Sequence, residues 1–100
     1  QRNMQVLLWK AGVDNLKALA DKWHSAAADP TKVNVPFLTV ISGQEGTVWK
    51  QQSIEWHNAI PSANKRLTML DAETGADAHC QGNNPLRLVQ EVDAWLREVL

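Results

Sequence analysis

The sequence has 100 residues, enough for one small domain, and its 44% hydrophobic and 21% charged residues are typical of a folded chain. The net charge of -1 gives no electrostatic reason to expect nucleic acid or an anionic membrane as a partner. A single cysteine excludes an internal disulfide framework and favours a reducing compartment, so we expect a cytoplasmic protein.

Two helices are predicted at the start of the chain. Apolar residues recur at helical spacing from Met4, and Gly12 is suited to end that helix. The second helix is predicted to begin at an Asp14 cap and to end at Pro30. Because residue 1 is not methionine, we expect the chain to begin inside a longer one.

The remaining chain predicts an α/β fold. Residues 37–41 are a continuous apolar run, typical of a strand that is buried on both faces. A helix is predicted over residues 47–60, a second strand over 66–70, and a last helix that starts at Pro85 after an Asn84 cap. Strand, helix and strand in this order predict a right-handed parallel βαβ unit. Since two strands make no stable sheet alone, we expect this unit to dock on a larger sheet from another segment.

Chemistry is expected where the two strands end, because sites in open parallel sheets form at the carboxyl ends of the strands. "SGQEG" after the first strand holds Glu45, and "DAETGADAHCQGNN" after the second holds Asp71, Asp77 and His79. A carboxylate from one loop can orient the imidazole from the other, which then takes a proton from a nucleophile.

The chain resembles the C-terminal part of an α/β-hydrolase. The resemblance lies in "VPFLTVISGQEG", "RLTML", "GADAHCQGNN" and the terminal "DAWLREVL". It is nearest to the group of serine hydrolases that includes the FrsA-like esterases and the fungal pigment hydrolases, which shorten polyketides by C–C cleavage. It implies that residues 1–30 end a cap region and that residues 31–100 form the strand–helix–strand–helix end of the core. The family order is serine, acid, histidine.

The resemblance implies that His79 is the catalytic histidine and that Glu45 is its acid. Many relatives carry an aspartate where this chain has Gly46, so Asp71, Asp77 or a carboxylate elsewhere stays open as the acid. Asp77 is expected to be solvated. No G-x-S-x-G occurs in the sequence, so the nucleophile is expected in a segment outside these residues.

Other candidate residues have simpler interpretations. Cys80 is expected to be buried beside the site, and one cysteine next to one histidine supplies too few ligands for zinc. No metal or organic cofactor is implied. His24 is expected to be exposed or at a domain contact, and His57 is expected at the surface. The five tryptophans should find apolar cover, while Trp23 and Trp49 are candidates for substrate binding.

The hypothesis is therefore a serine hydrolase that cleaves an ester or a carbon–carbon bond of a small molecule. Its expected partner is the remaining segment of the same enzyme, with a homodimer left open. The alternative is a non-catalytic α/β-hydrolase-like binding or interaction module, which the Gly46 departure favours. Expressed alone, the chain is expected to be poorly soluble or molten.

Overall fold

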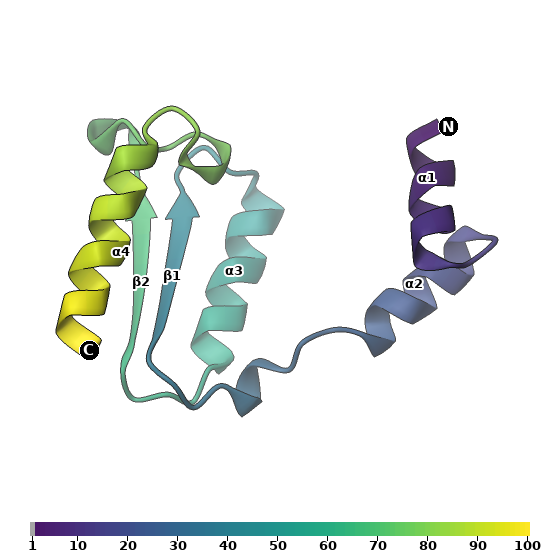
Figure 1. Cartoon of the computed structure of the whole chain (residues 1–100), viewed down its shortest axis with the longest axis horizontal. Coiled ribbons are helices and arrows are strands. Elements are labelled where there is room, and N and C mark those ends of the chain that lie inside the picture. The colour runs from purple at the N-terminus through teal and green to yellow at the C-terminus, as the bar shows by residue number, and fades with distance from the viewer. Residues whose placement is uncertain (1) are drawn as a thin grey trace.

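The computed structural model describes residues 2–100 as two parts joined by an extended segment (Figure 1). The first part is a pair of helices, α1 (Arg2–Ala11) and α2 (Leu16–Ser25). The second is a small α/β body made of β1 (Phe37–Ser42), α3 (Thr47–Ala59), β2 (Lys65–Leu70) and α4 (Pro85–Val99). The predicted order of helices and strands is confirmed.

The boundaries of α2 differ from the prediction. Asn15, not Asp14, caps the helix, because the Asn15 side chain accepts a hydrogen bond from a first-turn backbone N–H at 2.9 Å. The helix ends at Ser25, well before Pro30. Pro30 instead begins a short 3₁₀ turn, where its fixed φ and missing N–H are tolerated.

The two strands run parallel, and α3 connects them. Phe37 lies opposite Lys65 at one end of the register, and Ser42 lies opposite Leu70 at the other. The predicted parallel strand–helix–strand unit is therefore confirmed, and both strands end at the same edge (Figure 1). The chain is a small α/β domain with a two-stranded parallel sheet.

α3 and α4 cover opposite faces of the sheet. Thr39 Oγ1 on β1 lies 2.7 Å from Nδ1 of His57 on α3. Thr68 Oγ1 on β2 donates a hydrogen bond of 2.7 Å to Glu91 on α4. Thr68 is in register with Val40, the neighbour of Thr39, and adjacent residues of a strand point to opposite faces.

The cover on each face is thin. Residues 37–40 are only half-buried, and burial is complete at Ile41 and Ser42 alone. The expectation of a strand buried on both faces along its length is therefore wrong within this chain. One helix covers each face, and no third strand among residues 2–100 lies along the outer edge of β1.

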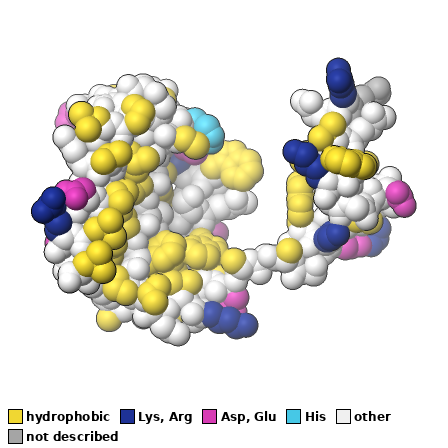
Figure 2. Space-filling view, viewed as in Figure 1, with side chains coloured by type: hydrophobic (Ala, Val, Ile, Leu, Met, Phe, Trp, Pro, Cys, Tyr) yellow, Lys and Arg dark blue, Asp and Glu magenta, His cyan; other side chains and the backbone are white. Residues whose placement is uncertain are grey.

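The tryptophans divide between cover and exposure. Trp95 on α4 is 6% exposed, and Trp56 on α3 is half-buried with its ring 5.5 Å from that of Phe37. The other three indoles are 58–80% exposed: Trp9, Trp23 and Trp49. The expectation that all five find apolar cover is thus wrong for this chain alone. Figure 2 shows apolar side chains at the surface of both parts.

No helix among residues 2–100 has both the length and the apolar character that crossing a bilayer requires.

Candidate active site

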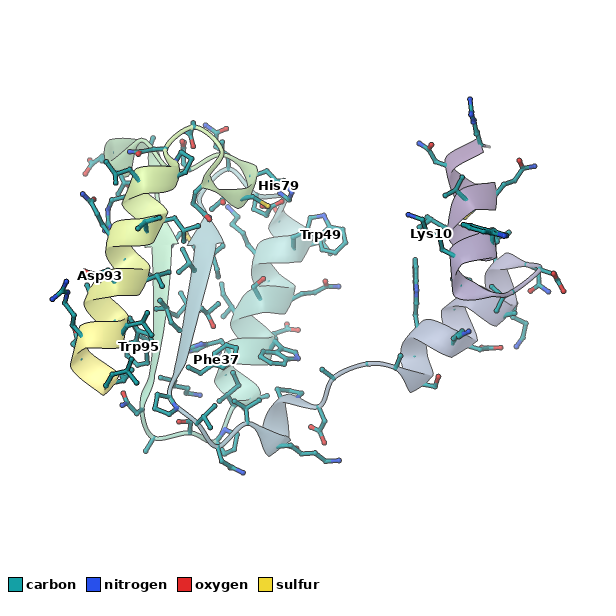
Figure 3. The ribbon with its side chains drawn as sticks, viewed as in Figure 1. Lys10, Phe37, Trp49, His79, Asp93 and Trp95 are labelled. Atoms are coloured by element: carbon teal, nitrogen blue, oxygen red, sulfur yellow. The ribbon has the colours of Figure 1, made fainter. Side chains whose placement is uncertain are left out.

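Two loops leave the sheet together where β1 and β2 end. We call residues 43–46 the acid loop and residues 71–84 the histidine loop. The backbone N–H of Gly43 donates to the carbonyl oxygen of Leu70 at 2.8 Å. A Cβ at position 43 would lie 3.0 Å from that oxygen and 3.2 Å from the Cα of Asp71, so a larger residue would push the two loops apart. Figure 3 shows His79 and Trp49 near this end of the sheet.

His79 and Glu45 make the central contact between these loops. His79 Nδ1 lies 3.0 Å from Oε1 and 2.9 Å from Oε2 of Glu45. An ionised carboxylate only accepts hydrogen bonds, so this contact places the imidazole proton on Nδ1. In the neutral ring, Nε2 is then an acceptor, and within residues 2–100 no hydrogen bond occupies it. The His79 side chain is 78% exposed and that of Glu45 is 24% exposed.

The local chain path explains why Glu45 reaches the histidine although position 46 is glycine. The backbone N–H of Glu45 donates to the carbonyl of Ser42 at 3.1 Å, which closes a turn directly after β1. Gly46 is already the N-cap residue of α3 and carries no side chain. The structure therefore brings together Glu45 and His79, the two residues expected to pair.

The other candidate acids have different partners. Asp71 accepts a hydrogen bond from a backbone N–H of its own loop at 3.2 Å. The Asp77 carboxylate accepts a hydrogen bond of 2.7 Å from Gln44 and another of 2.8 Å from Asn83. Neither carboxylate contacts His79. Asp77 is 6% exposed, so the expectation that it is solvated is wrong. The hydrogen bond from Asn83, together with that from Gln44, holds the pKa of the Asp77 carboxyl below its usual value.

Cys80 lies at the surface, so its expected burial is wrong. Cys80 and Gln81 both adopt the left-handed backbone conformation, with φ of 54° at each. This turn leaves the thiol outside and directs the Gln81 side chain inward, where its amide donates to Ser42 Oγ at 2.6 Å. Gln81 and Ser42 are both buried. The Gln81–Ser42 hydrogen bond is a second tie between β1 and the histidine loop.

The other two histidines lie away from this contact. His24 is exposed on α2, as expected. His57 is 6% exposed between α3 and β1, so the expectation of a surface position is wrong. Burial lowers the pKa of His57 below its usual 6.5, and the nearby charge of Lys65 acts in the same direction.

A cleft of about 550 Å³ opens beside the His79–Glu45 pair. It lies between β1, the first turns of α3 and the histidine loop, and Trp49, Gln52 and Cys80 are among its lining residues. The structure thus brings Trp49 to the pair. Trp23 lies on α2, which belongs to the separate helical part, and it does not line this cleft.

The four serines are all engaged elsewhere. Ser25, Ser53 and Ser62 donate to backbone carbonyls, and Ser42 accepts from Gln81. Within residues 2–100, no serine hydroxyl contacts the His79 imidazole. The same part of the chain gathers no group of three or more histidine, cysteine or acidic side chains that could hold a metal ion.

Sequence reasoning missed the ties that hold the two loops together, at Ser42–Gln81 and Gln44–Asp77. Glutamines in polar loops give no signal of burial or of a partner, so one sequence offers no means of finding them. Comparison of the chain with protein-family models, with curated proteins and with solved structures found no match to any of them.

Proposed function

We propose that this chain is the C-terminal segment of a serine hydrolase of the α/β type, in which His79 is the general acid/base and Glu45 orients it. The observation that carries the proposal is the contact of Glu45 with His79 Nδ1, at the carboxyl ends of two adjacent parallel strands. A carboxylate and a histidine from successive strand ends are the last two members of the serine, acid, histidine order.

The geometry of the pair supports a role in proton transfer. Glu45 holds the proton on Nδ1, which leaves Nε2 as the basic nitrogen toward a nucleophile. His79 Nε2 takes the hydroxyl proton of the serine as that oxygen attacks the substrate carbonyl, and the carboxylate stabilises the imidazolium that forms. His79 then returns the proton to the leaving group. In the second half, the same nitrogen activates the water that hydrolyses the acyl-enzyme.

The nucleophile and the oxyanion hole belong, in this proposal, to a segment outside these 100 residues. The absence of G-x-S-x-G from the sequence supports this, as does the engagement of all four serine hydroxyls elsewhere. The outer edge of β1 has no neighbour among residues 2–100, and it is where further strands would add to the sheet. Val89 and Leu96 leave an apolar face on α4, which that segment would also cover.

The substrate we propose is a small carbonyl compound, either an ester or a polyketide-like diketone that is cleaved at a carbon–carbon bond. Trp49 lines the cleft beside His79, where its indole would contact the substrate. In this proposal residues 1–30 end a cap, and Trp23 on α2 would reach the substrate only when that cap is complete. An exposed, unpaired Cys80 thiol fits a reducing compartment and supports a cytoplasmic location.

The proposal is tested by hydrolysis of p-nitrophenyl esters by the intact protein. His79→Ala is expected to reduce kcat by roughly 10³-fold or more, because loss of the base leaves only binding and the oxyanion hole. His24→Ala, which removes an exposed imidazole from α2, is the control and should keep activity within about twofold. Full activity of His79→Ala would overturn the assignment. An inactive wild-type protein that still binds small carbonyl compounds would favour the non-catalytic binding module instead.

A further inference from the structure

The two loops of the candidate site are joined by a second set of contacts behind the Glu45–His79 pair. We call the side chains of Gln44, Asp77 and Asn83 the loop clamp. Gln44 Nε2 donates to Asp77 Oδ2 at 2.7 Å, and Asn83 Nδ2 donates to Asp77 Oδ1 at 2.8 Å. The backbone N–H of Gln44 also donates to the carbonyl oxygen of Asp77, at 2.9 Å. Asp77 therefore binds the acid loop through two of its oxygens and its own loop through a third.

The clamp lies next to both members of the pair along the chain. Gln44 directly precedes Glu45, and Asp77 is two residues before His79. Asn83 extends the clamp toward His79, because its Oδ1 accepts the backbone N–H of Ala78, the residue before the histidine, at 3.2 Å. One buried carboxylate thus fixes the chain on either side of the catalytic contact.

The pair itself is too exposed to hold the loops in place. The His79 side chain is 78% exposed, and a contact between charged groups that water reaches so freely adds little by itself. Asp77, by contrast, is 6% exposed and has both carboxylate oxygens in hydrogen bonds. Hydrogen bonds to a charged, buried acceptor are stronger than neutral or solvated ones, and removal of that acceptor leaves its donors without a partner. The buried Gln81–Ser42 hydrogen bond anchors the histidine loop to β1, and the clamp extends that connection to the acid loop beside Glu45.

We propose that Asp77 is a positioning residue, which holds Glu45 against His79 Nδ1 through the loop clamp and so sets the tautomer of the imidazole. Its effect on catalysis rests on the proposed function, whereas its effect on the tautomer does not. Asp77→Ala frees the side chains of Gln44 and Asn83 but keeps the backbone hydrogen bond from Gln44 to residue 77, so it loosens the acid loop relative to His79. We expect kcat to fall by at most about tenfold, the loss expected on removal of Glu45 itself, because Asp77 acts only through Glu45. KM should change by less than about twofold, because Asp77 does not line the cleft.

The direct readout is the tautomer of His79 by nitrogen NMR of the intact protein, labelled with ¹⁵N in its histidine rings. The spectra are recorded at about pH 8, where imidazole is ordinarily neutral. The His79 signals are assigned by their loss in His79→Gln. In the wild type we expect proton-bearing Nδ1 and acceptor Nε2. In Asp77→Ala we expect a shift toward the Nε2–H form, which imidazole side chains favour in water.

Asp71→Ala is the matched control, since the Asp71 side chain caps a turn in the same loop and makes no hydrogen bond to the acid loop. It should keep the wild-type tautomer. Gln44→Ala is a second variant that keeps the buried carboxylate and removes an exposed side chain, so it decides the question if circular dichroism shows Asp77→Ala to be unfolded. It should shift the tautomer in the same direction.

The outcomes separate the two proposals. A wild-type Nδ1–H tautomer in the folded Asp77→Ala variant, or in Gln44→Ala if Asp77→Ala does not fold, would overturn the clamp even if the protein is an esterase. The same shift in Asp71→Ala as in Asp77→Ala would also overturn it, because any loosening of the loop would then suffice. A shifted tautomer in a protein without esterase activity would support the clamp and overturn the proposed function alone.

Discussion

Replacement of Glu45 by two different residues tests how the acid acts on His79. Glu45 approaches Nδ1 with both oxygens, at 3.0 and 2.9 Å. A hydrogen bond to a charged group contributes about 1.5–3 kcal/mol, and about 1.4 kcal/mol corresponds to a factor of ten in rate. Because water reaches the His79 side chain, which is 78% exposed, we take the lower end of that range for Glu45→Ala. Its kcat should therefore fall by roughly tenfold.

Glu45→Gln should lower kcat more than Glu45→Ala does, although glutamine is closer to glutamate in shape. An amide NH₂ at that position donates to Nδ1 and so places the ring proton on Nε2, where it blocks proton transfer from the nucleophile. A locked wrong tautomer costs up to roughly 10⁴-fold in serine hydrolases.

The assay is steady-state p-nitrophenyl ester hydrolysis by the intact protein across pH. The control is Asp93→Asn, which neutralises a 55% exposed carboxylate paired with Arg97 on α4. Equal kcat values for Glu45→Ala and Glu45→Gln would refute the tautomer argument, and wild-type rates in both would refute the role of Glu45.

Gly43→Ala should lower the free energy of unfolding of the intact protein by about 1–3 kcal/mol, because the new Cβ would lie 3.0 Å from the Leu70 carbonyl oxygen. An unchanged midpoint of urea unfolding would contradict this close approach. Stability should also fall as the pH drops below about 6.5, since burial lowers the pKa of His57 in the folded state and the unfolded chain therefore takes up the proton first. This contribution to stability is complete above the pKa of His57 in the unfolded chain and is lost as the pH falls through its pKa in the folded protein. His57→Gln should therefore flatten this part of the profile of urea midpoint against pH. A profile identical to that of the wild type would contradict the prediction. Residues 1–100 expressed alone should melt without a sharp calorimetric transition, because only six apolar residues among residues 2–100 are buried; a cooperative peak would show that the chain is stable without further strands.

The course of the backbone could be predicted because local patterns determine it. Apolar periodicity located the helices, and the apolar run before Gly43 located β1. Asn84 and Pro85 predicted the start of α4, where the Asn84 side chain accepts from a first-turn N–H at 3.3 Å. The pairing of strands followed from the length of the crossover. At Asp14 the prediction failed because two neighbouring residues can both cap, and only the backbone decides between them.

The burial of polar side chains could not be predicted in the same way. Asp77, His57 and Gln81 look like loop or surface residues in the sequence, yet each is buried because a partner far along the chain satisfies it. Such partners depend on how β1 and β2 place their loops. The prediction that Cys80 is buried failed for the opposite reason, because the left-handed backbone at this residue turns an apolar side chain outward. The contact of Glu45 with His79 could be predicted from the sequence only because both residues follow strand ends that parallel pairing brings together.

The central claim is that His79 is the general base for a nucleophilic serine outside these 100 residues. The most direct measurement is labelling of the intact protein with a fluorophosphonate, followed by peptide mapping of the modified residue. We predict one labelled serine outside residues 1–100, with labelling at least roughly 100-fold slower in His79→Ala and unchanged in His24→Ala. A serine that is labelled at the same rate in His79→Ala as in the wild type, or the absence of any labelled serine, would contradict it.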